Sequence, residues 1–466
     1  MKNNYPIRRM MALLLLLAMM VSITACGSGN SSESEPTAES SATASTEETQ
    51  QPTAETDATA SATQKPSSSA TSGATSEPTN TPAGSATQKP ITENEKPDLT
   101  ASLKEFKDVK IYDKFGEWPL KTGKEYYSSE VGTWFTIWWD LPTSTFGNFH
   151  WLQECRLKPV DYGYYSNLNK GYLTSVFARL NYIGIDFLLL DDTNGHWSDN
   201  NGIANRMLAC FQVAKSLKGF APQIAIATGQ PLREGNTTEQ QREFDAYYDL
   251  YNKYKDYFYK YQGKPLLVNY IAGVANARYD DSRFTIRYGT GLISWQNRAS
   301  NQSIFKTQGN WGWVYDMQNK GSEVMGVQPG YNKPGMESAV IKRNGGQHYI
   351  EQWLAAIKAN PNVIMIPSYN DHCEETGWEA TTPVKAAGAG LDQVPSGEDP
   401  YLYEKITEAY LALRYGFIDG FFYKVENTSQ VYQYKNGVLQ KSTTAAAGKE
   451  PIILLPTGYI EWEQSR

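Results

Sequence analysis

Short apolar runs recur along residues 98–466 and alternate with segments in which apolar residues return every three or four positions. Such runs, six to eight residues long, are typical of strands buried on both faces. Strands of this kind occur in parallel sheets that helices cover. Eight runs are present, at 133–139, 185–191, 223–228, 265–271, 283–288, 311–316, 323–328 and 362–369.

Helical periodicity fills several of the intervals between these runs. The clearest segments are 171–182, 202–217, 244–261, 348–358 and a last helix at 404–415. Eight strands alternating with helices predict an α/β fold, a (β/α)8 TIM barrel. An open doubly wound sheet is the alternative, but no glycine-rich phosphate loop follows any of the runs.

The pattern changes after the last predicted helix. Segments 421–425, 431–440 and 451–456 resemble strands, and Asn436-Gly437 is a hairpin signal within the second of them. We therefore predict a barrel domain at 98–416 and a small C-terminal β appendage at 417–466, packed on the barrel.

Residues 1–25 have the features of a secretory signal peptide, with Lys2, Arg8 and Arg9 before a run of leucine and methionine. The sequence Ile23-Thr24-Ala25-Cys26 resembles the lipobox of bacterial lipoproteins. It predicts cleavage before Cys26, lipidation of that cysteine by groups such as palmitate, and attachment to the extracytoplasmic face of the cell membrane. An ordinary signal peptide and a short membrane anchor remain alternatives.

Residues 26–97 contain no Phe, Trp or Tyr and consist mainly of Ser, Thr, Ala, Glu, Pro and Gln. The hexapeptide SATQKP occurs twice, at 61–66 and 85–90. Such a segment buries too little apolar area to offset its ordering entropy. It predicts a disordered tether that spans roughly 50 Å as a random coil.

Charge and cysteine content narrow the function classes. The formal net charge is −7, made of +3 in residues 1–25, −7 in the tether and −3 in the remainder. A body this close to neutral does not indicate nucleic-acid binding. Beyond Cys26 only Cys155, Cys210 and Cys373 remain, without metal-ligand spacing. A disulfide between two of them has no support in the sequence. We expect a monomer without metal or cofactor.

In a barrel of this type, functional residues follow the C-terminal ends of the strands. Aromatic rings beside carboxylates at these ends suit sugars, because rings stack on pyranose faces and carboxylates accept hydrogen bonds from hydroxyls. The candidate substrate-binding residues are Trp139, Asp140, Asp192, His196, Asn269, Tyr270, Tyr331, Tyr369, Asn370 and Glu379.

Alternatives remain open at several of these positions. Only one of Asp191 and Asp192 can point inward from a strand, and we favour Asp192 for the cleft, although either also suits a helix cap. Trp138 and Trp139 should face opposite sides, one in the core and one as a stacking platform.

Asp371 and Glu374 form the sharpest chemical signal. They lie three residues apart after the eighth run, so both can point into one cleft. Hydrolysis of a glycosidic bond needs one carboxyl that protonates the leaving oxygen and a second that acts as base or nucleophile. The alternatives are a solvated acidic loop and a cation site.

Four stretches resemble glycoside hydrolase family 99 and its WbsX-like relatives. They are YYSNLNKGYLTSVFARLNYIGIDFLLLDD at 164–192, GKPLLVNYI at 263–271, VQPGYN at 327–332 and QHYIEQWLAAIKANPNVIMIPSYNDHCEETGWEAT at 347–381. The resemblance covers about residues 130–380 and implies a (β/α)8 barrel. In this family the eighth strand ends in Ser-(Trp/Tyr/Phe)-Asn-Glu-Trp-(His/Ala)-Glu-Gly, followed by a short spacer and Ile-Glu.

The resemblance implies roles for individual residues. Ser368, Tyr369 and Asn370 match the start of the motif, and Glu379 matches its trailing Glu. Asp371 stands at the first catalytic Glu, which in the endo-acting, retaining α-mannosidases of the family is thought to deprotonate the 2-hydroxyl of the sugar and give an anhydro-sugar. Glu374 stands at the second Glu, the general acid/base.

The chain departs from the family's pattern in two ways, in the length of one catalytic side chain and in its neighbours. Asp371 is one methylene shorter than the family's Glu, His372 replaces its Trp, and Glu375 replaces its Gly. A shorter carboxylate changes the reach to the proton it must handle. We expect a surface-anchored hydrolase of an extracellular glycan, with an α-mannoside-like substrate and endo action. The alternatives are a non-catalytic glycan-binding lipoprotein with a degenerate barrel site and a solute-binding lipoprotein of a transporter, which would have two lobes and a hinge.

Overall fold

The structure is a computed structural model, and it describes residues 119, 124–233, 235–271, 279–291, 299–312, 323–333, 340–387, 391–395 and 397–465. The predicted leader, Cys26 and the tether lie outside the described residues. Among the helices that the structure describes, none combines the length and the apolar character needed to cross a membrane.

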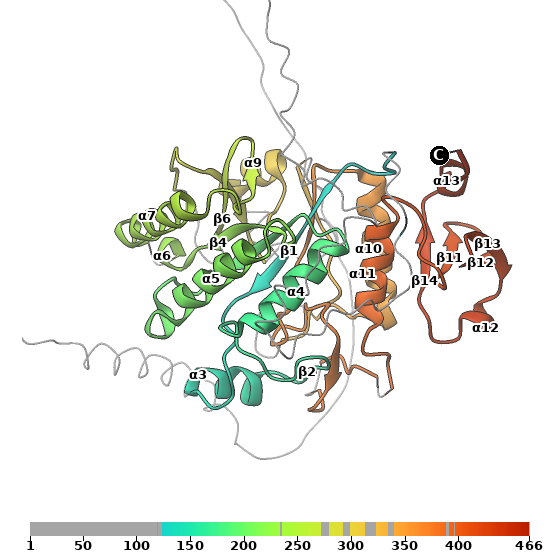
Figure 1. Ribbon diagram of the computed structural model, residues 1–466, viewed down its shortest axis with the longest axis horizontal. Coiled ribbons are helices and arrows are strands. Elements are labelled where there is room, and N and C mark those ends of the chain that lie inside the picture. Colours follow the sequence, from blue (N-terminus) through green and yellow to red (C-terminus); the bar gives the residue numbers. More distant parts are fainter. Residues whose placement is uncertain are drawn as a thin grey trace, which may run out of the picture. The chain divides into compact units, whose positions relative to one another are not determined.

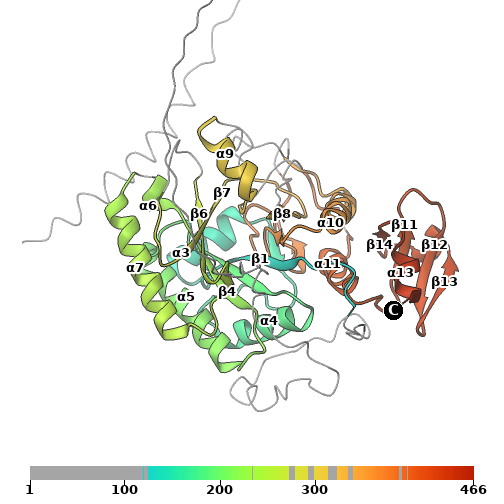
Figure 2. The same cartoon turned by 90° about the horizontal axis from the view of Figure 1, so that it is seen from above.

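A curled parallel sheet forms the centre of the described chain (Figures 1 and 2). Within the described residues its seven parallel strands run in the order β7-β6-β4-β3-β1-β9-β8. Their bounds are β1 Glu130–Thr136, β3 Phe187–Asp191, β4 Gln223–Thr228, β6 Lys264–Tyr270, β7 Thr285–Gly289, β8 Val324–Gly326 and β9 Val363–Ile366. The first strand pairs with both the second and the last, which is the cyclic neighbour order of a barrel.

The described strands do not close the barrel. Seven of the eight predicted strands are confirmed, and the remaining run, 311–316, is described only at its first two residues. There the Trp311 N–H donates to the Tyr288 carbonyl at 3.2 Å, and a Cβ on Gly289 would lie 2.5 Å from the Gly312 nitrogen. The chain therefore passes directly beside β7, where an eighth strand would belong, and the full barrel stays a prediction.

Two apolar layers separate the faces of the sheet. The inner layer contains Trp134, Phe187, Leu189, Ala225, Ala227, Leu266, Val268 and Met365. The outer layer contains Phe135, Leu188, Leu190, Ile224, Ile226, Leu267, Ile364 and Ile366, which cluster with helix residues. Because successive strand side chains point to opposite faces, the position of a strand-end residue decides which layer it joins.

Helices cover the outer face of the curled sheet (Figure 2). The main ones are α4 Lys170–Tyr182, α5 Ser198–Ser216, α7 Thr237–Tyr254, α10 Gln347–Ala359 and α11 Leu402–Ala412. Shorter elements are α3 Thr145–Asn148, the π-helix η2 Phe149–Glu154, α6 Gln230–Arg233, α9 Ala299–Gln308, the 3-10 turn η3 Asn344–Gly346 and the antiparallel pair β2 Leu157–Pro159 and β10 Thr381–Pro383.

The predicted helix 244–261 is wrong at its C-terminal end. Helix α7 ends at Tyr254, and Lys260–Tyr261 forms strand β5, antiparallel to β6. The two strands turn at Gln262 and Gly263, whose φ angles are 52° and 82°. Two left-handed residues in a row are typical of the tight turn that joins strands, so the aromatic residues after the helix belong to the sheet region.

A second, four-stranded sheet follows the last helix, in the order β13-β12-β11-β14. Its elements are β11 Phe422–Val425, β12 Val431–Lys435, β13 Val438–Ser442, α12 Thr444–Ala447, β14 Ile452–Leu455 and α13 Tyr459–Ser465. The predicted hairpin is confirmed, because Asn436 and Gly437 turn the chain with φ of 53° and 79°. Strand β14 contacts α10 and α11, and the Tyr410 hydroxyl donates to the Leu454 carbonyl at 3.1 Å.

Candidate active site

The segment after β9 folds back on itself as a compact loop. The Asp371 N–H donates to Ser368 Oγ at 2.8 Å, and Ser368 Oγ lies 3.0 Å from Thr376 Oγ1. The Glu379 N–H donates to the Tyr369 carbonyl at 2.9 Å. These hydrogen bonds among five residues of the loop hold its fold, which fixes where the side chains at 371 and 374 begin.

Asn370 joins this loop to the first strand. Its Oδ1 accepts from the Thr136 N–H at 2.7 Å, and its Nδ2 donates to the Thr136 carbonyl at 3.0 Å. The Asn370 carbonyl accepts from Trp139 Nε1 at 3.0 Å. The amide therefore clamps the end of β1 to the end of β9, and its hydrogen-bonding groups are occupied by the protein rather than available to a sugar.

Asp371 and Glu374 differ in exposure. Asp371 is 1% exposed, whereas the Glu374 side chain is 15% exposed and lies beside Lys333, with 3.5 Å between Nζ and Oε1. Burial and the charge of Glu374 raise the pKa of Asp371 well above its ordinary value. Burial lowers the pKa of Lys333, but the two carboxylates outweigh it and raise that pKa above its ordinary value.

Asp191 faces the same region as Asp371. It follows Phe187 and Leu189 on the inner face of β3, and its charge contributes to the raised pKa of Asp371. Its Oδ1 accepts from the Thr193 hydroxyl at 2.8 Å, and burial raises its own pKa. We expected Asp192 to face the cleft; strand alternation gives that direction to Asp191 instead.

Asp192 belongs to a sealed cluster between the sheet and α7. Its Oδ2 lies 2.7 Å from His196 Nδ1 and accepts from the Tyr247 hydroxyl at 2.9 Å. Glu243 accepts from Thr228 Oγ1 at 2.5 Å and from the His196 N–H at 3.0 Å. Burial and the charge of Asp192 raise the pKa of Glu243 to about 7. His196 and Asp192 thus serve as partners within the protein.

Glu375 occupies the position of the family's glycine in a backbone conformation that glycine favours. Its φ is 53°, in the left-handed region. The side chain pairs with Arg156 and accepts from Asn332 Nδ2 at 3.0 Å, and the carbonyl accepts from Arg343 at 2.7 Å. These contacts hold a conformation that a side chain disfavours by about 1–2 kcal/mol.

An aromatic stack lies beneath the loop. The Trp139 and Trp151 rings are 3.8 Å apart, and His372 stacks on Trp151 at 5.6 Å with 27° between the planes. His372 Nε2 lies 2.9 Å from Glu379 Oε2, which also accepts from the Tyr165 hydroxyl at 2.8 Å. His372 therefore keeps a planar ring where the family has Trp, and it adds a polar partner for the trailing Glu379.

Several predicted binding residues are core residues in this structure. Trp139 is fully buried, and Tyr369 is buried with its ring stacked on Phe135. Trp138 and Trp139 do not face opposite sides, because β1 ends at Thr136 and the two rings stack at 5.7 Å. Trp138 Nε1 instead donates to Asp191 Oδ2 at 3.4 Å, on the inner side.

The remaining predicted residues lie at other strand ends. Asp140 pairs with Arg206 at 3.4 Å, and although burial raises its pKa, hydrogen bonds and this cation lower it overall. Asn269 is buried on the outer side of β6, where Nδ2 donates to the Tyr279 carbonyl at 3.5 Å. Tyr270 is half-buried on the inner side and meets Trp134 edge to face at 6.2 Å.

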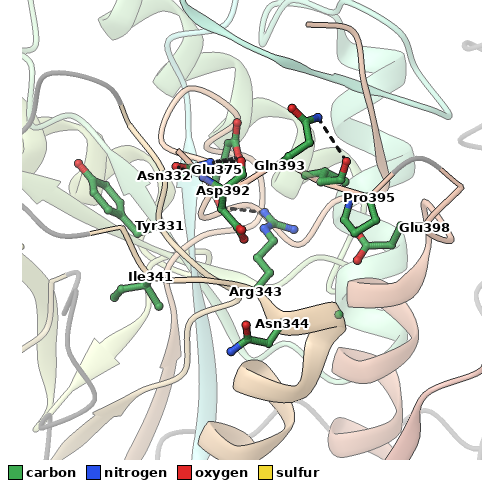
Figure 3. Close-up of a pocket in the computed structure, with 12 residues that line it drawn as sticks. Tyr331, Asn332, Ile341, Arg343, Asn344, Glu375, Asp392, Gln393, Pro395 and Glu398 are labelled. Carbon is green, nitrogen blue, oxygen red and sulfur yellow. Dashed lines mark hydrogen bonds between the residues drawn. The ribbon is translucent and has the colours of Figure 1, made fainter. Parts of the chain in front are cut away.

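A polar pocket opens beside the loop (Figure 3). It encloses about 490 Å³ including its open mouth. Tyr331, Asn332, Arg343 and Glu375 line one part, while Asp392 and Glu398 contribute further carboxyl groups. The Asn332 N–H donates to the Glu374 carbonyl at 3.0 Å, so the pocket shares backbone with the Glu374 site. Within the described residues, no group of three or more His, Cys, Asp or Glu is arranged to hold a metal ion.

Sequence reasoning missed four residues that shape the site: Lys333, Arg343, Tyr165 and Glu243. Lys333 directly follows the run VQPGYN, and Tyr165 lies inside the first resembling stretch, so position alone could have marked these two. Glu243 directly precedes the predicted helix 244–261 and lies in the first half of the observed α7, and only folding shows that it reaches the end of β4.

Comparisons with known proteins give distant structural similarities. No protein-family model matches the chain, and no curated protein matches its sequence. A GH99 endo-alpha-mannosidase from Bacteroides thetaiotaomicron aligns with a TM-score of 0.44 and 14% identity, over 60% of this chain and 96% of the other. The same enzyme in complex with BIS-TRIS-propane gives 0.44 and 15%, over 61% and 97%. Because these similarities are low, the activity of the chain has to be inferred from its own residues.

Proposed function

We propose that the protein is a glycoside hydrolase that cleaves a glycosidic bond in an extracellular glycan. The observation that carries the proposal is the pair Asp371 and Glu374. The two carboxyl groups lie on one tightly held loop at the end of β9, one buried and one accessible beside Lys333. Two carboxyl groups in unlike environments can divide the tasks of holding and accepting a proton.

Glu374 is the proposed general acid/base and Asp371 its partner. Burial and the charge of Glu374 raise the pKa of Asp371, so we propose Asp371 as the holder of the proton, while Glu374 lies 3.5 Å from the Lys333 ammonium. A sugar hydroxyl that donates to Asp371 would stabilise the ionised form there. The proton released by Asp371 then moves to Glu374, which has access to the leaving oxygen.

The proposed substrate is an α-mannoside-like glycan cleaved internally. This choice rests on the resemblance of the loop motif and on what the structurally similar enzymes are named for. Tyr270 and Asp191 are the proposed sugar contacts on the inner side, an aromatic ring at the end of β6 and a carboxyl at the end of β3.

Non-catalytic glycan binding is the second candidate, and the burial of Asp371 favours it. A carboxyl that is 1% exposed reaches a substrate only if the loop shifts, and its side chain is one methylene shorter than the Glu of the family. A transporter-linked binding protein would need two lobes, whereas the described parallel strands form one continuous sheet.

The deciding experiment uses a chain that begins at Gly27, assayed on α-mannans and on other microbial, plant and host glycans. Wild type should release new reducing ends, and Glu374→Gln should not. Glu351→Gln, an exposed change on α10, is the matched control and should behave as wild type. Binding of one glycan by both proteins without cleavage would establish the capture function instead.

The location is proposed from the leader: lipid attachment at Cys26 on the extracytoplasmic face, with the tether holding the folded body away from the membrane. The test compares full-length protein with Cys26→Ser in the producing cell. Wild type should sediment with membranes and incorporate labelled palmitate, and the variant should do neither. Soluble wild-type protein without label would refute the anchor.

A further inference from the structure

Two buried thiols meet between η2 and the loop after β9. Cys155 caps the C-terminal end of η2, directly after Glu154, and Cys373 lies in the loop between Asp371 and Glu374. Their sulfur atoms are 2.8 Å apart, closer than unbonded sulfur atoms normally pack. Both residues are buried, and they come from positions 218 residues apart in sequence.

The neighbourhood of the two sulfur atoms is already rigid. The Cys155 N–H donates to the His150 carbonyl at 3.0 Å, which fixes the end of η2. On the other side, the loop hydrogen bonds at Ser368 and Asn370 fix the backbone around Cys373. Forming a bond between the two sulfur atoms therefore needs only a small approach of side chains whose backbones are held.

We propose that Cys155 and Cys373 form a disulfide in the mature protein, and that this bond fastens η2 to the loop that carries Glu374. All three cysteines of the described residues are free thiols in the structure, and with this bond formed Cys210, buried on α5, would be the one left free. The odd cysteine number of the body is thereby accounted for. The proposal depends on the proposed function in one respect only: the protein must be exported to a compartment that holds the oxidant.

The bond forms by thiol–disulfide exchange with an external disulfide, of a protein oxidant or a small molecule. One cysteine thiolate attacks that disulfide, and a thiol leaves; the second cysteine then attacks the mixed disulfide, and the second thiol leaves. The two cysteines lose two electrons and two protons, and the oxidant is reduced to two thiols. No metal or further reactant is needed.

The timing follows from the surroundings of the sulfur atoms. Burial raises the pKa of Cys155, and burial together with Cys155 raises the pKa of Cys373 well above the ordinary value. The folded protein therefore offers little reactive thiolate. We expect exchange during folding, before η2 covers the loop, and slow reduction once both sulfur atoms are sealed.

The first test maps cysteines in full-length protein made in an oxidising compartment, denatured without reductant in an excess of alkylating reagent. Mass spectrometry of the peptides should show Cys155 joined to Cys373 and Cys210 alkylated. Alkylation of all three cysteines, in this protein and in protein refolded with oxidised glutathione, would overturn the proposal. Neither outcome depends on hydrolase activity, so failure here leaves the proposed reaction untouched.

The second test measures thermal unfolding of the oxidised and reduced protein. Closure of so long a loop should make the oxidised form melt higher by roughly 5–10 °C. Cys210→Ala should keep this difference, and Cys155→Ala/Cys373→Ala should abolish it. An equal Tm with and without reductant in wild type would contradict a structural disulfide. If the double variant fails to fold, the peptide map of wild type still decides.

Discussion

Two groups of acidic residues lie near the ends of strands of one sheet, yet they are built differently. The β9 cluster comprises Asp371, Glu374 and Lys333, on the loop after the last parallel strand and the segment after β8. The α7 cluster comprises Asp192, His196, Glu243 and Tyr247, between the outer face of the sheet and α7. In the first, an accessible carboxylate faces a cation at 3.5 Å; in the second, side chains of the protein seal the acids.

The difference shows that an acidic residue at the end of a strand is not necessarily available to a substrate. Asp191 and Asp192 are adjacent in sequence, but one turns to the inner face and the other to the helix layer. An acid on the outer face meets helix residues that satisfy it. In the β9 cluster Glu374 keeps 15% of its side chain exposed, whereas Asp371 is buried.

The largest expected effect is on catalysis. Glu374→Gln keeps the size of the side chain but removes its proton chemistry, so kcat/KM should fall by about 10²–10⁴ while the Tm stays close to that of wild type. Steady-state kinetics with the best glycan substrate provide the measurement. A fall of less than about tenfold would show that Glu374 is not the general acid/base. The β9 cluster would then no longer differ from the α7 cluster in function.

The next effect is a pH dependence of stability that arises in the α7 cluster. Glu243 has a pKa of about 7 in the folded protein against an ordinary 4.5, so the unfolded state binds fewer protons between these values. The contribution of Glu243 to the free energy of unfolding is fully present below about pH 4.5. It is lost as the pH rises towards 7, and it amounts to about 3 kcal/mol.

Urea unfolding of wild type and Glu243→Gln across pH 4.5–7.5 measures this term. The variant should lose the part of the slope that belongs to Glu243. Glu239→Gln, a change at a partly exposed position on the same helix, should keep the slope of wild type. Identical slopes in all three proteins would show that Glu243 titrates normally and that the cluster is not sealed.

Asp192→Asn should lower stability by about 2 kcal/mol. The carboxylate accepts from two donors through Oδ2, while Oδ1 has no hydrogen-bond partner among the described residues. An amide there would therefore leave buried N–H groups without acceptors. Asp249→Asn, exposed on α7, is the control and should change stability by less than about 0.5 kcal/mol. A fall in kcat/KM as large as that of Glu374→Gln would place Asp192 in the cleft after all.

The smallest effect is expected for Tyr247→Phe. The change removes the hydroxyl that donates to Asp192 at 2.9 Å and lies 3.3 Å from Glu243, at a cost of about 1 kcal/mol. Activity should not change. Tyr251→Phe, on the same helix and partly exposed, is the control and should leave both stability and activity unaltered. Equal effects of the two changes would show that the Tyr247 hydroxyl does not stabilise the protein through Asp192.

Most strands could be predicted from sequence, because a parallel strand buried on both faces is apolar throughout. The helix that ends at Tyr254 was extended too far, since aromatic residues continue at helical spacing through 261 and only Gln262-Gly263 marks the turn. Local propensity and strand pairing compete in this segment, and pairing with β6 prevails.

The site was less predictable than the fold. The pair Asp371 and Glu374 could be recognised from its spacing, and no comparison with known proteins tests its role. The partners could not be found, because Lys333 lies 41 residues from Glu374 and reaches it only through the fold. The inward direction of Asp191 depended on the last residues of β3, where a shift of one position reverses the answer.

The clamp between the ends of β1 and β9 bears on how the chain folds. The Thr133 hydroxyl donates to the Ile366 carbonyl across 233 residues. The Thr136 N–H likewise donates to Asn370 Oδ1. Pairings this distant in sequence slow folding, because loop-closure entropy is lost before any contact is gained. During synthesis the first strand has one edge without its final neighbour until residue 366 has emerged. The central sheet is thus completed by the last of its parallel strands to be made.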